Sequence, residues 1–220
     1  MPKALKNHGL TIALLSLFLL SILGQWVAGW KVDNEELARH GEPTVSIFAY
    51  LASPEFLSSV FENWESEFLQ MSAYVVLTAM LFQKGASESR DPDEAPRDEN
   101  LKAQARKHGA PRILMGGPAA RWLYSHSLGM ALFTLFILSF LLHWWNSAAA
   151  AAAEATQHGE AAKGVLAYLG DPQLWFESFQ NWQSEFLSTA VLVVLSIWLR
   201  QKESPESKPV AAPHAQTGTA

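Results

Sequence analysis

The sequence predicts an all-α membrane protein with four transmembrane helices, arranged as two tandem two-helix repeats with parallel (same-orientation) pseudo-twofold symmetry. Two observations carry this prediction. Residues 8–89 recur at 126–207 with a constant offset of 118 positions and no gap, and each copy holds one long and one shorter apolar run. A residue kept in both copies suits two similar structural positions, so the duplication also marks candidate functional residues.

The long runs, residues 10–27 and 123–145, lack formal charge and are long enough to cross a hydrocarbon core of roughly 30 Å. The shorter runs, 68–82 and 186–199, follow at the same spacing. The first run, with Lys3 before it, also fits a secretory signal peptide. Because its repeat partner lies in mid-chain, where no signal peptide can be, we expect an uncleaved helix.

The basic residues predict the orientation, since cytoplasmic loops of membrane proteins carry an excess of Lys and Arg. Most of them flank the termini or lie in the middle loop, whereas the other two loops hold only Lys31, Arg39 and Lys163. Both termini and the middle loop should therefore be cytoplasmic, and both repeats should have the same orientation. The predicted cytoplasmic residues are Lys3, Lys6, Lys84, Arg90, Arg97, Lys102, Arg106, Lys107, Arg112, Arg121, Arg200, Lys202 and Lys208.

These boundaries divide the chain into four parts. We expect a first repeat at 1–83, a basic cytoplasmic linker at 84–122, a second repeat at 123–202 and a disordered C-terminal tail at 203–220. The linker should contain a surface helix at 101–108 and a break at Gly116 and Gly117.

The outer loops should contain short helices at 33–40 and 147–158, each closed by a glycine, Gly41 or Gly159. A new helix should begin in each repeat after Ser53-Pro54 or Asp171-Pro172, because a capping residue followed by proline is typical of a helix start. Whether this helix is continuous with the following span stays open.

The strongest signature shared by the copies is Asn-Trp-x-Ser-Glu-Phe-Leu, at 63–69 and 181–187. At 100° per residue its polar members share one face, so a polar stripe enters the outer part of the second span of each repeat. A carboxylate about a turn inside the hydrocarbon edge is costly unless it faces protein, water or a partner, which makes it a functional-site candidate. These candidates are Asn63, Ser66, Glu67, Asn181, Ser184 and Glu185.

Gln25 and His143 are repeat equivalents that could complete this layer. Counted at 1.5 Å per residue, they lie roughly 25 Å above the cytoplasmic boundary, the same height as Glu67 and Glu185. Four tryptophans should anchor the interface. They are Trp26, Trp64, Trp144 and Trp182.

Three functional interpretations remain open. The layer is either structural, joining helices in a non-enzymatic protein, or the cation- or proton-binding site of a small transporter, channel or sensor subunit, or the centre of a membrane enzyme that uses Glu67, Glu185 and His143. The structural interpretation is favoured. A pathway through four short helices would require a homo-oligomer.

Other chemistry has little support in the sequence. The chain has no cysteine and no phosphate-binding loop or metalloprotease motif. His40-Gly41-Glu42 and its copy at 158–160 fit a helix-ending turn better than a metal site. We expect no metal, no cofactor and no nucleic-acid partner, because attraction to the lipid bilayer accounts for the basic residues of the linker.

The paired spans and the duplicated Asn-Trp-x-Ser-Glu-Phe-Leu motif resemble an uncharacterised family of bacterial inner-membrane proteins, a domain of unknown function. The resemblance covers the chain up to about Lys202. It implies a multi-pass protein of the bacterial cytoplasmic membrane, and it implies no activity and no ligand.

Overall fold

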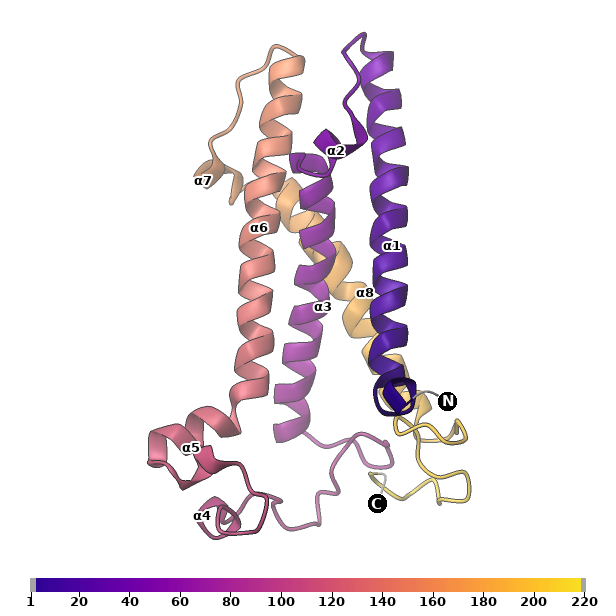
Figure 1. The fold of residues 1–220 in the computed structure, drawn as a ribbon, viewed down its shortest axis with the longest axis vertical. Coiled ribbons are helices and arrows are strands. Elements are labelled where there is room, and N and C mark those ends of the chain that lie inside the picture. The colour runs from indigo at the N-terminus through magenta and orange to yellow at the C-terminus, as the bar shows by residue number, and fades with distance from the viewer. Residues whose placement is uncertain (1–2, 219–220) are drawn as a thin grey trace. The chain divides into compact units, whose positions relative to one another are not determined.

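The computed structural model describes residues 3–218 and is all-α, without a strand in that range (Figure 1). The ends of the predicted first repeat and tail, residues 1–2 and 219–220, lie outside the described residues. The elements are α1 (Lys3–Arg39), α2 (Ile47–Tyr50), α3 (Pro54–Met80), α4 (Leu101–Gln104), the 3-10 turn η1 (Arg112–Met115), α5 (Pro118–Ser125), α6 (Ser127–Gln157), α7 (Val165–Tyr168) and α8 (Pro172–Leu195).

The chain divides into two compact units. Unit 1 comprises Met1–Val60 and Leu142–Tyr168, and unit 2 comprises Phe61–Leu141 and Leu169–Ala220. Each unit is described by itself below.

Two helices are long and apolar enough to cross a membrane by length and composition. They run over Leu5–Arg39, 35 residues, and Ser127–Gln157, 31 residues. Their length corrects one prediction, because the expected outer helices at 33–40 and 147–158 are the last turns of α1 and α6 and not separate elements. The predicted glycine ends are confirmed, since Gly41 and Gly159 adopt φ values of 74° and 70°, where glycine carries no steric penalty.

The structure also shows the outcome of the predictions for the later helices and the linker. The helices that begin at Pro54 and Pro172 continue without interruption to Met80 and Leu195, which settles the question left open by the sequence. The break at Gly116 and Gly117 is confirmed, because α5 begins at the following proline. The linker helix is shorter than 101–108 and ends at Gln104.

In unit 1, residues 41–46 bring α2 back against α1 (Figure 1). The approach is close at Gly29, where a Cβ would lie 2.5 Å from the Tyr50 hydroxyl oxygen, so a larger residue would displace the buried tyrosine. The N-terminal part of α3 is joined to α6 by a 2.6 Å hydrogen bond between the Ser58 and Ser147 hydroxyls.

The same local structure recurs at positions 118 residues apart. The indole N–H of Trp26 donates to the Ile47 carbonyl at 2.8 Å, and that of Trp144 donates to the Val165 carbonyl at 2.9 Å. Short helices leave several carbonyls without intrahelical donors, and the indoles satisfy one in each.

In unit 2, α6 packs on α3 and α8. At Gly129 of α6 an added Cβ would lie 3.4 Å from a Val76 methyl of α3, so the small residue permits the close approach of the two helices. On the other side, aromatic rings of α6 and α8 interlock: Phe136 lies 6.2 Å from Trp182 and Phe140 lies 5.9 Å from Trp175 between ring centroids. This packing holds α3 and α8 in the register described next.

Candidate functional site: the polar seam between α3 and α8

Polar side chains of α3 and α8 meet along one line in unit 2, which we name the polar seam. Its hydrogen-bonded pairs are Glu62 with Asn181, Glu65 with Trp182, and Gln70 with Thr189. Around the axis of α3 the Glu62 position lies between those of Glu65 and Gln70, and the three cover roughly 140° of the helix surface. The pairs span about two turns, so the seam joins the helices over a length and not at one point.

Glu65 is the most deeply buried member of the seam. Its side chain has no exposed surface, and its carboxylate accepts a hydrogen bond from the Trp182 indole N–H at 2.8 Å. The neighbouring Ser66 is also buried and donates to the Asn63 carbonyl of its own helix at 2.8 Å. A buried carboxylate is costly without donors, so the indole compensates part of that cost.

The Glu62 and Gln70 pairs flank Glu65 on either side. The Asn181 amide donates to a Glu62 carboxylate oxygen at 2.5 Å, and the Gln70 amide donates to the Thr189 hydroxyl oxygen at 2.5 Å. Thr189 in turn donates to the Glu185 carbonyl at 3.0 Å, so its hydroxyl is used in both roles.

Glu67 and Glu185, the predicted carboxylate pair, lie close enough to interact electrostatically. Glu67 is exposed and Glu185 is half-buried. Both belong to unit 2, and there the charge of Glu67 acts on the Glu185 carboxylate.

The remaining predicted residues of the layer are placed differently. Asn63 and Ser184 are exposed, and the Ser184 hydroxyl donates to the Asn181 carbonyl of its own helix at 2.9 Å. Gln25 and His143 belong to unit 1. There the Gln25 amide donates to the Ser59 hydroxyl at 3.1 Å, and the His143 side chain is fully buried.

The predicted tryptophan anchors serve two different purposes. The indole N–H groups of Trp26 and Trp144 donate hydrogen bonds to backbone carbonyls of α2 and α7. Trp182 belongs to the polar seam, and Trp64 lies edge-on to Phe61 with ring centroids 5.5 Å apart.

The outer turns carry contacts of their own in unit 1. The His40 and His158 rings lie edge to face with centroids 6.0 Å apart, and the Gln157 amide donates to the Glu42 carboxylate at 2.9 Å. These side chains lie at the two helix ends closed by glycine, and their contacts join the ends of α1 and α6.

Sequence reasoning missed Glu65, Glu62 and Thr189. Glu65 occupies the variable position of the Asn-Trp-x-Ser motif, and its repeat equivalent is Gln183. Searching for residues kept in both copies removes such positions. The helical spacing of Glu62 and Gln70 with Ser66 was the available signal, because the three share one face of α3.

The fold and the seam define a class: an all-α protein with two long apolar helices that could span a membrane. The chain belongs to the family described as domain of unknown function (DUF6766), whose model matches residues 1–219. No curated protein and no solved structure gives a significant match. The expected membership of a family of unknown function is therefore confirmed.

Proposed function

We propose that this chain is a multi-pass protein of the bacterial inner membrane, built from two tandem two-helix repeats that cross the membrane four times with both termini in the cytoplasm. Three large side chains illustrate the apolar surface of its long helices: Leu10 is 73% exposed, Leu20 is 68% exposed and Leu128 is 62% exposed. Such a surface is costly in water and stable in lipid. The matching indole contacts of Trp26 and Trp144 support the repeat.

Within this membrane protein we assign the polar seam a structural, non-enzymatic role. The observation that carries the assignment is the fully buried Glu65 carboxylate, held by the Trp182 indole. In lipid, helices gain little from the hydrophobic effect on association, and interhelical hydrogen bonds with close packing join them instead. The seam supplies such bonds at three levels of α3 and α8.

A comparison of two equivalent substitutions tests this role. Glu65→Leu should lower the thermal unfolding midpoint of the purified protein and weaken the association of α3 with α8, because it removes the acceptor of the indole. Gln183→Leu makes the matching change at the repeat equivalent, which is exposed, and should leave the midpoint nearly unchanged. Equal midpoints for the two variants would contradict the structural role.

A second candidate function, proton or cation binding in a small transporter, channel or sensor, is favoured by one observation. The Glu67 and Glu185 carboxylates interact although no bond joins them to a common donor in the described residues. Two nearby carboxylates can share a proton or bind a cation. Proteoliposomes loaded with a pH-sensitive dye test this: transport predicts a proton flux that Glu67→Gln and Glu185→Gln each reduce, and flux equal to that of empty liposomes excludes it.

A further inference from the structure

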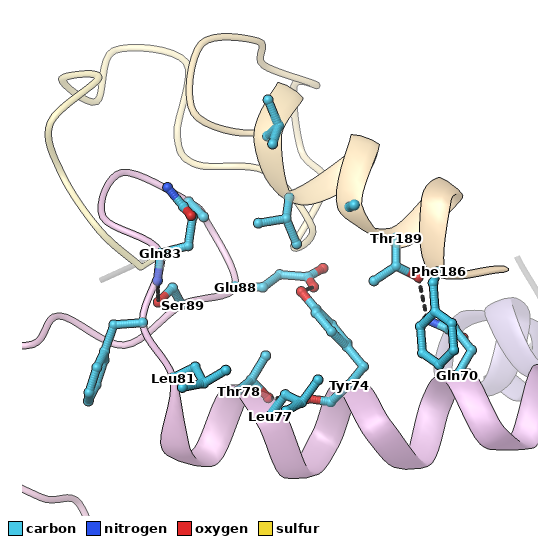
Figure 2. A pocket seen from close by; sticks show the side chains of 15 residues that line it. Gln70, Tyr74, Leu77, Thr78, Leu81, Gln83, Glu88, Ser89, Phe186 and Thr189 are labelled. Atoms are coloured by element: carbon cyan, nitrogen blue, oxygen red, sulfur yellow. Dashed lines mark hydrogen bonds between the residues drawn. The ribbon is translucent and has the colours of Figure 1, made fainter. Parts of the chain in front are cut away.

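A cavity of about 400 Å³ opens in unit 2 between the C-terminal halves of α3 and α8 and the segment 83–89 that follows α3 (Figure 2). This volume lies within the range of small-molecule sites, roughly 300–1,000 Å³. Most of its wall is apolar. The apolar lining includes Leu77, Leu81, Phe186, Ala190, Val193 and Val194.

The polar groups of the cavity are not spread evenly over its wall. Figure 2 shows the Glu88 carboxylate reaching into the space from the segment after α3, where the Tyr74 hydroxyl donates a hydrogen bond to it. The Gln70 and Thr189 pair closes another part of the wall. The cavity therefore combines an apolar body with one acidic group.

A second carboxyl group reinforces the acidic character. Glu206 of the C-terminal tail is hydrogen-bonded to Glu88, and this bond, followed by repulsion from the Glu88 charge and by partial burial, raises the pKa of Glu206 above its ordinary value. Among the described residues neither carboxyl group has a Lys, Arg or His partner at ion-pair distance. Negative charge at this place is thus shared between two acids and is not neutralised by a basic side chain.

We propose that this cavity binds a lipophilic organic cation, an amine or quaternary ammonium compound whose apolar part lies against α3 and α8 and whose positive charge lies beside Glu88. The apolar wall matches a hydrocarbon or aromatic group, and the negative charge that Glu88 shares with Glu206 provides the counter-charge. An anion would be repelled by this charge. A small metal ion would leave the apolar wall unused and would require several oxygen ligands.

Equilibrium dialysis of the full-length protein in lipid nanodiscs tests the proposal, with empty nanodiscs subtracted. The probe is tritiated benzyltrimethylammonium, and the shape-matched neutral compound is neopentylbenzene. We expect saturable binding of the cation and binding of the neutral compound that is at least about tenfold weaker, because the neutral compound lacks the charge that is attracted to Glu88; a tenfold difference corresponds to about 1.4 kcal/mol. No saturable binding of the cation, or equal binding of the two compounds, overturns the proposal.

Variants with matched controls assign the binding to this cavity. Glu88→Gln should weaken cation binding about tenfold while keeping an acceptor for Tyr74, and Glu203→Gln, at an exposed tail position, should not. Ala190→Phe should block the cavity, whereas Ala79→Phe, on an exposed position of α3 outside the lining, should not. The two pairs of variants are independent. If one variant fails to fold, the other pair still tests whether the cation binds in this cavity. Wild-type affinity in well-folded Glu88→Gln or Ala190→Phe overturns the proposal.

Discussion

Trp182 donates its indole N–H to the carboxylate of Glu65 at 2.8 Å, and the Glu65 side chain has no exposed surface. The two residues belong to α8 and α3, and both lie in unit 2. The bond therefore joins α3 and α8 through residues 117 positions apart, which do not correspond at the 118-residue offset of the two similar sequence segments. Substitutions at Glu65 and Trp182 should therefore have effects that the same changes at the corresponding positions of the other copy do not have.

The first prediction concerns this bond. Trp182→Phe removes the donor and should lower the free energy of unfolding by about 1–3 kcal/mol, since the buried carboxylate loses a partner. Trp198→Phe, at an exposed position of the chain after α8, is the control. In a double-mutant cycle with Glu65→Leu, the coupling should exceed about 0.5 kcal/mol, and additive losses would show that the bond contributes nothing.

The second prediction concerns Glu67 and Glu185. Because the two carboxylates interact, Glu67→Gln and Glu185→Gln should change the free energy of unfolding, measured by thermal unfolding, non-additively. The double variant should therefore differ from the sum of the single variants by more than about 0.5 kcal/mol. A pair of Gln substitutions at Glu35 and Glu160, exposed carboxylates of the outer turns, should be additive.

The third prediction concerns membrane topology. The chain has no cysteine, so each engineered cysteine is an isolated reporter. Thr44→Cys and Thr156→Cys should react with an impermeant thiol reagent on intact spheroplasts, whereas Glu99→Cys and Lys202→Cys should react only after lysis. All four positions are exposed, so burial does not limit the reaction. Labelling in the reversed pattern would invert the proposed orientation.

The fourth prediction concerns pH. The pKa of Glu206 is raised by its hydrogen bond to Glu88, so the folded state holds this proton more tightly than the unfolded chain does. The resulting stabilisation is fully present below the ordinary Glu pKa of 4.5 and is lost as the pH rises through the higher folded-state pKa.

Thermal unfolding midpoints recorded as a function of pH check this sign. The wild-type midpoint should fall as the pH rises above about 4.5, and Glu206→Gln should flatten that fall because the amide does not titrate. Glu203→Gln should retain the wild-type profile. An unaltered profile in Glu206→Gln would show that another group causes the dependence.

The fifth prediction concerns Lys208, which is buried in the tail. Its ammonium donates to the carbonyls of Gly85 at 2.6 Å, His214 at 2.9 Å and Gln216 at 2.9 Å, and burial followed by the nearby Arg200 charge lowers its pKa. Lys208→Met should cost roughly 2 kcal/mol of stability and expose the tail to protease, because these carbonyls lose their donor. Lys202→Met, at an exposed position, should do neither. Equal proteolysis of the two variants would contradict the anchoring role.

Much of the helical fold could be predicted because its signals are local. The apolar runs, the prolines at helix starts and the glycines at 41 and 159 act within a few residues, and the structure places helices and helix ends accordingly. The outer helices at 33–40 and 147–158 were wrongly separated from their spans. No proline stands between them and the apolar runs, and the one glycine there, Gly29, does not interrupt α1, so one continuous helix satisfies more backbone hydrogen bonds.

The candidate site was less accessible to sequence reasoning. Glu65 and Glu67 are two positions apart and hence roughly 200° apart around a helix, so they point to opposite sides of α3. The duplication singled out Glu67, which is exposed, whereas Glu65 faces α8 and is buried. The rotation of α3 about its own axis decides between them, and that rotation depends on packing against other helices.

The sequence by itself determined the all-helical class, the two long apolar helices and their glycine ends, because transfer of apolar side chains from water and backbone capping act locally along the chain. Only the tertiary structure decided that Glu65 pairs with Trp182, that Gln70 pairs with Thr189, and that Glu88 and Glu206 meet beside an apolar cavity. Those pairs join segments more than a hundred residues apart in the chain. Their contact depends on how distant segments of the chain pack together, which no local sequence pattern encodes.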